Sequence, residues 1–159
     1  MNFFSTPKKS LGQNFLMDKN IINKIIKIGN IEKNNKVLEI GPGEGNLTNK
    51  IIDMNPKKVY AIEKDKKLAD LLKDNFQKNK KVEIINDDIL NIIKNDNFGK
   101  NIIVFGNLPY NISTQILASL IQIKKWPPWY KVLIFMFQKE VADRIISKEN
   151  SRDFGRLSI

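Results

Sequence analysis

The chain has 159 residues, of which 42% are hydrophobic and 28% are charged, as expected for one globular domain and too few for two ordinary ones. It has no cysteine and no histidine, so disulfides, Cys/His zinc sites, thiol nucleophiles and histidine general bases are excluded. The net charge of +10 favours phosphate-bearing partners, but a general drift of composition toward lysine would give the same charge.

The predicted elements alternate between helices and short β-branched strands. After a basic N-terminal segment over residues 1–18, Asp18 is expected to cap a helix that ends near Gly29. Strands are then expected at residues 37–40, 59–63, 82–85, 102–105 and 132–137. Helices are expected at residues 47–54, 66–76, 89–94, 113–123 and 139–146. Residues 126–129 are predicted to form a rigid loop before the last of these strands.

This alternation predicts an α/β fold with a parallel sheet, helices on both faces, and ligands bound at the carboxyl ends of the strands. Residues 155–159 begin another apolar alternation, so the chain is expected to end inside a further strand. The longest apolar run, residues 132–137, is too short to span a membrane, and residues 1–16 lack the pattern of a secretory signal. A cytoplasmic protein is therefore expected.

A glycine-rich turn follows the first predicted strand. Gly41, Gly43 and Gly45 allow positive φ and close approach of a ligand to the backbone. A dinucleotide-binding turn would need a small residue where Asn46 stands, and no Gly-Lys-Ser/Thr sequence follows, so pyrophosphate and P-loop sites are disfavoured. For Glu39, two roles remain open: a carboxylate near a cationic part of a cofactor, or a structural hydrogen bond to the glycine turn.

Carboxylates follow the next two predicted strands. Glu63 stands about twenty residues after the first glycine, where a carboxylate can accept the two hydroxyls of a ribose. Asp88 can accept a hydrogen bond from the amino group of an adenine, whereas Asp87 is expected to cap the following helix. A nucleoside held in this way, with no phosphate cradle, indicates S-adenosylmethionine rather than NAD or ATP.

The segment Asn107-Leu-Pro-Tyr-Asn-Ile-Ser follows the fourth predicted strand. The Asn107 side chain offers a carbonyl acceptor, and Pro109 restrains Leu108 to extended conformations, which holds the Leu108 carbonyl in one direction. Tyr110 adds a ring on which a purine can stack. The segment is suited to holding a flat base and its amino group, although an ordinary strand-to-helix turn would use similar residues.

Five blocks of sequence occur in order over almost the whole chain: KSLGQNFL at 9–16, EIGPGEGNLT at 39–48, NLPYNIS at 107–113, FMFQKEVADR at 135–144 and GRLS at 155–158. Together they resemble the ribosomal RNA adenine N6,N6-dimethyltransferases that modify small-subunit RNA. The resemblance implies a Rossmann-like methyltransferase fold that binds S-adenosylmethionine through Asn14, Leu16, Gly41, Glu63, Asp88 and Asn107. It places the target adenine against Asn107, Leu108, Pro109 and Tyr110, and assigns Phe137 to a second wall for the base. A position in the strand core is the alternative for Phe137 and Phe135, and it is favoured for Phe135.

The resemblance also implies dimethylation of adenine N6 in small-subunit ribosomal RNA, a role in ribosome biogenesis, and the small-subunit precursor as partner. A cytoplasmic monomer without a metal is expected. Family members continue with two more strands and a small helical domain, so residues 1–159 are expected to be a single, incomplete catalytic domain. Two alternatives remain: an RNA-binding assembly factor without turnover, and a large-subunit RNA adenine methyltransferase of the macrolide-resistance type.

Overall fold

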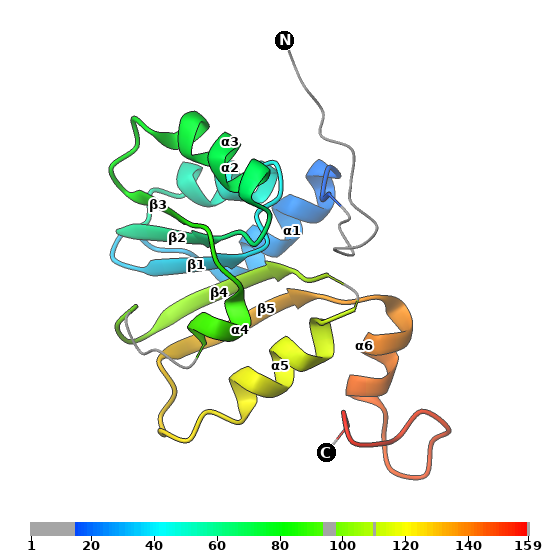
Figure 1. Cartoon of the computed structure of the whole chain (residues 1–159). Helices are drawn as coiled ribbons and strands as arrows, with labels where there is room; N and C mark the ends of the chain where they lie inside the picture. Colours follow the sequence, from blue (N-terminus) through cyan, green and yellow to red (C-terminus); the bar gives the residue numbers. More distant parts are fainter. Residues whose placement is uncertain (1–14, 94–97, 110, 159) are drawn as a thin grey trace.

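The computed structural model describes residues 15–93, 98–109 and 111–158, and in this part of the chain five parallel strands form one sheet in the order β3-β2-β1-β4-β5 (Figure 1). The strands are β1 (Lys36–Ile40), β2 (Lys58–Ile62), β3 (Val82–Ile85), β4 (Ile102–Asn107) and β5 (Tyr130–Met136). The helices are α1 (Lys19–Gly29), α2 (Asn46–Asp53), α3 (Lys66–Phe76), α4 (Ile89–Ile92), α5 (Ser113–Ile121) and α6 (Lys139–Ile146). The predicted parallel α/β fold is therefore confirmed.

Helices cover both faces of the sheet. Side chains of successive strand residues point to opposite faces, so the apolar strands give both faces apolar side chains that the helices bury. Val37 packs with α1 and α2, whereas Leu38 packs with α4 and α5. Figure 1 shows α1, α2 and α3 on one side of the sheet and α4 and α5 on the other. Strands buried on both faces give the continuous apolar runs from which the parallel sheet was predicted.

Helix α1 begins and ends where the sequence predicts. The Asp18 carboxylate accepts hydrogen bonds from the backbone N–H groups of Asn20 and Ile21, at 2.7 and 3.2 Å. These two bonds satisfy donors that have no partner inside the helix. The helix ends at Gly29, where an added Cβ would lie 2.3 Å from the Phe105 ring, so glycine lets α1 approach β4.

The last residues of the chain differ from the prediction. Residues 155–158 form a turn rather than a strand: the Gly155 carbonyl accepts from the Ser158 N–H at 2.9 Å, and the Gly155 N–H donates to the Ser158 hydroxyl at 3.2 Å. Apolar alternation makes a strand only where a neighbouring strand can pair with it, and in the described sheet no strand lies beside this segment. No described helix is long and apolar enough to cross a membrane.

A buried carboxyl group links β1 to α2. Glu39 is 2% exposed, and the Thr48 hydroxyl donates to its carboxylate at 2.6 Å. Burial raises the pKa of Glu39 from 4.5 to about 7; the Thr48 hydrogen bond opposes this shift and the charge of Glu63 adds to it. The described partner of Glu39 is thus the helix after the glycine turn, rather than the turn itself.

Glu39 is expected to make stability depend on pH. The folded protein holds the Glu39 proton more tightly than the unfolded chain, so proton binding by Glu39 stabilises the fold. This stabilisation is fully present below pH 4.5 and is lost as pH rises to about 7. The Glu39→Gln variant, which keeps the shape of the neutral acid, should flatten the fall in the free energy of unfolding measured by urea denaturation across this window. Burial also raises the pKa of Glu63, so the free energy of unfolding of the variant should still fall with pH, with a smaller slope. An unchanged slope in the variant would contradict the assignment.

Candidate active site

In the described structure, a cavity lies at the carboxyl ends of β1, β2, β3 and β4. Four of the six predicted cofactor residues, Gly41, Glu63, Asp88 and Asn107, line it. Its apolar wall is formed by Ile40, Ile62, Leu68, Ile89, Ile112 and Ile116. The cavity therefore combines a broad apolar surface with a few polar groups, as small-molecule sites do.

A smaller hollow adjoins this cavity and shares Gly41, Gly43 and Asn107 with it. Leu16, another predicted cofactor residue, and the buried Glu39 lie there. The Asn46 amide donates to the Leu16 carbonyl at 3.1 Å and so fastens the N-terminal segment to the start of α2. From the sequence, Asn46 was expected only to disfavour a dinucleotide-binding turn, so this role was missed.

Gly43 is required by its surroundings. Its φ is +59°, and an added Cβ would lie 3.0 Å from the Phe15 ring, which lines both hollows. The Gly43 N–H donates to the Glu63 carboxylate at 3.2 Å. The glycine turn thus serves the site through one backbone donor and through the space it leaves for Phe15, a residue that sequence reasoning did not assign to the site.

Glu63 is held in a fixed orientation. One carboxylate oxygen accepts from Gly43, as above, and the other accepts from the Asp65 N–H at 2.9 Å. Burial raises the pKa of Glu63, and these two hydrogen bonds oppose the rise. Each carboxylate oxygen has a second lone pair, so the group can still accept hydrogen bonds from a ligand in the cavity.

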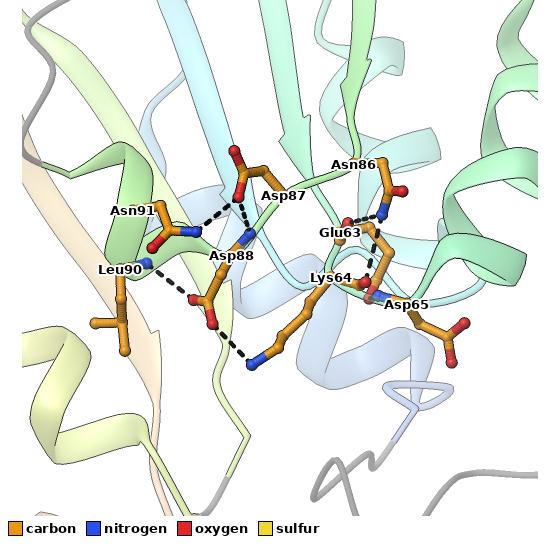
Figure 2. A network of polar contacts seen from close by, with 8 residues as sticks. All are labelled: Glu63, Lys64, Asp65, Asn86, Asp87, Asp88, Leu90 and Asn91. Carbon is orange, nitrogen blue, oxygen red and sulfur yellow. Dashed lines mark hydrogen bonds and ion pairs between the residues drawn. The ribbon is translucent and has the colours of Figure 1, made fainter.

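Asn86 ties the turn after β2 to the turn after β3. Its amide donates to the carbonyls of Glu63 and Lys64, at 2.8 and 3.3 Å (Figure 2). Because these bonds hold the two turns in register, the carboxylates they carry keep fixed positions. Nothing in the sequence pattern distinguished Asn86 from other asparagines of the chain.

Asp88, rather than Asp87, caps α4, which corrects the prediction. One Asp88 carboxylate oxygen accepts from the Leu90 N–H at 3.0 Å, and the other accepts from the Lys64 ammonium at 2.7 Å (Figure 2). Asp87 instead accepts from the Asp88 N–H and from the Asn91 amide. Burial alone would raise the pKa of Asp88, but the Lys64 and Leu90 bonds outweigh it, so the pKa lies below its usual value.

The predicted base-holding segment begins with Asn107, which is the last residue of β4. Asn107 and Pro109 line the cavity, and Leu108 is 2% exposed, its side chain being packed in the core. A buried side chain fixes the backbone on which it stands, so the Leu108 carbonyl has little freedom. Tyr110 and Asn14, which were predicted to hold the base and the cofactor, lie outside the described residues.

Phe135 and Phe137 lie side by side on β5 and its end, with ring centroids 6.2 Å apart and an interplanar angle of 82°. Both pack against the core on the α4 and α5 face, and neither lines the cavity described above. The core position predicted for Phe135 fits this arrangement. The role of Phe137 as a wall for the base stays a prediction.

Charge and shape together define what the cavity accepts. Of the described residues, Glu63, Asp87 and Asp88 line it together with one cation, Lys64, which is already paired with Asp88. A nucleoside that carries positive charge fits this set, whereas a diphosphate or triphosphate would meet carboxylates. Among the described residues, no group of three or more acidic side chains could hold a metal ion.

The comparisons with known proteins agree with this geometry. Residues 4–159 match the family model for ribosomal RNA adenine dimethylase. Ribosomal RNA small subunit methyltransferase A of Pelagibacter ubique is 53% identical over 156 residues, covering 98% of this chain and 58% of that protein. The protein of the same name from Mycoplasmopsis synoviae is 47% identical over 152 residues, covering 96% and 56%. The chain thus spans a little more than half the length of these relatives.

Solved structures show the same fold. A dimethyladenosine transferase from Plasmodium falciparum superimposes with a TM-score of 0.78 at 31% identity, covering 92% of this chain and 51% of that one. The 23S rRNA methyltransferase ErmE gives a TM-score of 0.69 at 27% identity, covering 82% and 50%. With a family model that matches nearly every residue and relatives of this similarity, the chain belongs to the ribosomal RNA adenine dimethylase family.

Proposed function

We propose that the chain transfers methyl groups from S-adenosylmethionine to the N6 amino group of adenines in small-subunit ribosomal RNA, and that it dimethylates them. The observation that carries the proposal is the position of Asn107 and Pro109 in the same cavity as Glu63 and Asp88. The base-holding segment and the nucleoside-binding carboxylates thus face one space. Relatives named small subunit methyltransferase A support the choice of RNA.

The described residues suit this cofactor. Glu63 would accept hydrogen bonds from the two ribose hydroxyls, and Asp88 from the adenine amino group, while the isoleucine-rich wall covers the flat ring. Gly41 lets the backbone approach the cofactor, and Leu16 lines the smaller hollow. Glu39 lies at that hollow, where a bound cation would favour its ionised form. When bound, S-adenosylmethionine supplies a methyl group bonded to a positively charged sulfur. Loss of that methyl group turns the sulfur into a neutral thioether.

The substrate amine is held by carbonyl oxygens of this chain. The Asn107 side-chain oxygen and the Leu108 backbone oxygen would accept the two hydrogens of N6, which shifts the amine toward tetrahedral geometry and frees its lone pair. Methyl transfer to N6 would form the N–C bond as the C–S bond breaks, the electron pair of that bond would stay on sulfur, and the extra N6 proton would pass to solvent. The adenine must leave its stack to reach this position. This chain would therefore accelerate the transfer mainly by positioning the adenine amine, and no histidine or cysteine is needed.

The site needs no second copy and no metal in this proposal. The mechanism uses only carbonyl and carboxylate oxygens, and this chain supplies the residues that carry them. We infer a cytoplasmic monomer acting on the small-subunit precursor, where ribosomal RNA is available.

Replacing Asn107 by alanine should lower methyl transfer by a factor of ~100 or more, as the loss of one group that stabilises a transition state commonly does. S-adenosylmethionine binding should weaken much less, because Glu63 and Asp88 remain. Transfer of labelled methyl to immature small subunits measures the effect, with Asn23→Ala on the exposed face of α1 as the matched control. Undiminished transfer by Asn107→Ala would remove the catalytic assignment, and equal transfer to large subunits would contradict the substrate.

Replacing Glu63 by glutamine should weaken S-adenosylmethionine binding by a factor of ~10 to 100, the cost of losing charge-assisted hydrogen bonds. Calorimetry gives the dissociation constant directly. Glu83→Gln is the control: this carboxylate is also on the sheet but is half exposed and pairs with Lys58. A dissociation constant that stays the same in Glu63→Gln would contradict the proposed cofactor site.

A further inference from the structure

The two edges of the sheet carry opposite charge. In the described chain, the segments that lead into the five strands contain eight lysines and one acid: residues 30–35, 54–57, 77–81, 98–101 and 122–129. The segments that leave the strands contain five acids and one lysine: residues 41–45, 63–65, 86–88, 108–109 with 111–112, and 137–138. Because the sheet is parallel, all the basic segments lie at its amino edge (Figure 1). The cavity lies at the opposite, carboxyl edge.

Two general causes do not explain this separation. A drift of composition toward lysine would place lysines at both edges. The helix dipole favours cations in the last turn of a helix, and its effect falls off within that turn. Lys57 and Lys80 each lie three residues beyond the C-cap of the preceding helix. Lys100 lies two residues before β4, and Lys131 is the second residue of β5.

Aromatic side chains lie among these lysines at both ends of the amino edge. Trp126, which follows Lys125 directly in the loop before β5, is 79% exposed. At the β3 end, a groove is lined by the half-buried Phe76 together with Lys78, Lys80 and Lys81. Exposed rings beside cations are the usual means by which proteins bind single-stranded nucleic acid, because every base can stack on a ring.

We propose that this amino edge, defined here as the basic edge by Lys57, Lys80, Lys100, Lys131 and Trp126, binds a single-stranded segment of ribosomal RNA. The lysines contact its phosphates, and Trp126 stacks on a base. Four strand spacings give the edge a length of ~19 Å between β3 and β5. The inference rests on the proposed function only in that ribosomal RNA supplies the strand.

The basic edge would offset the electrostatic repulsion between the acidic cavity and the RNA backbone. The carboxylates that suit a cationic cofactor repel the phosphates on either side of a target adenine. Cations on the far edge attract the same RNA without weakening the cofactor site. Lys36 and Lys58 also lie at this edge, but they bind the Phe98 carbonyl and Glu83 and so belong to the fold.

The test compares two sets of four substitutions with equal change in charge. The first set is Lys57→Gln, Lys80→Gln, Lys100→Gln and Lys131→Gln. The control set consists of exposed lysines in the first two turns of α1 and the first turn of α3, toward the cavity side: Lys19→Gln, Lys24→Gln, Lys66→Gln and Lys67→Gln. The probe is labelled oligouridylate, which contains no adenine and so does not depend on the proposed catalytic pocket.

The basic-edge set should lower the slope of log affinity against log salt concentration by ~3, since each phosphate contact on a single strand contributes ~0.7. The control set should lower it by much less. Trp126→Ala alone should weaken binding at least ~5-fold without changing the slope, as loss of one stacked base does. Equal salt slopes for the two sets of variants would overturn the inference. So would displacement of the RNA by poly-L-glutamate together with unchanged RNA affinity in Trp126→Ala.

Calorimetry with S-adenosylmethionine on the same preparations separates the two proposals. If the variants bind the cofactor normally while oligouridylate binding is unaffected by the basic-edge set, the inference about the edge fails and the proposed function stands. If the unchanged protein binds oligouridylate through the basic edge but does not bind the cofactor, the proposed function fails and the surface assignment stands.

Discussion

The common direction of the strands is the constraint on which the site depends. In a parallel sheet, every strand ends at the same edge, so short turns far apart in the sequence meet around one space. The glycine turn after β1, Glu63 after β2, Asp88 after β3 and Asn107 at the end of β4 come together for this reason. Each crossover helix returns the chain to the opposite edge, so the turns there are free to carry a different chemistry.

Glu63 connects this arrangement to the chemistry. Its carboxylate accepts hydrogen bonds from N–H groups of both the glycine turn and its own turn, so the proposed ligand-binding group and the turn beside it are positioned together. Burying a carboxylate charge is costly, and the raised pKa values of Glu39 and Glu63 reflect that burial, which their hydrogen bonds only partly offset. A cationic cofactor would offset it, which is why a cluster of carboxylates at this edge is compatible with a stable fold.

Much of this could be predicted from the sequence, because the signals were local. The Asp18 cap and the apolar face of α1 lie within a few residues of each other, and the bounds of α3 and α6 were predicted correctly. Asp87 and Asp88 were harder: adjacent acids are equally good caps by type, and only the position of Lys64 and the start of α4 distinguish them. Contacts between distant turns, such as Asn86 with Glu63 or Asn46 with Leu16, leave no local pattern. The turn at 155–158 shows the same limit for a strand that needs a neighbour.

The most direct measurement of the central claim is a crystal structure of the chain with S-adenosylhomocysteine and adenosine. The account predicts that the ribose hydroxyls of the cofactor product bind the Glu63 carboxylate. It also predicts that the amino group of the adenosine points at the Asn107 side-chain oxygen and the Leu108 carbonyl. An Asn107 side chain turned away from the cavity, or a cofactor product bound elsewhere on the chain, would contradict it.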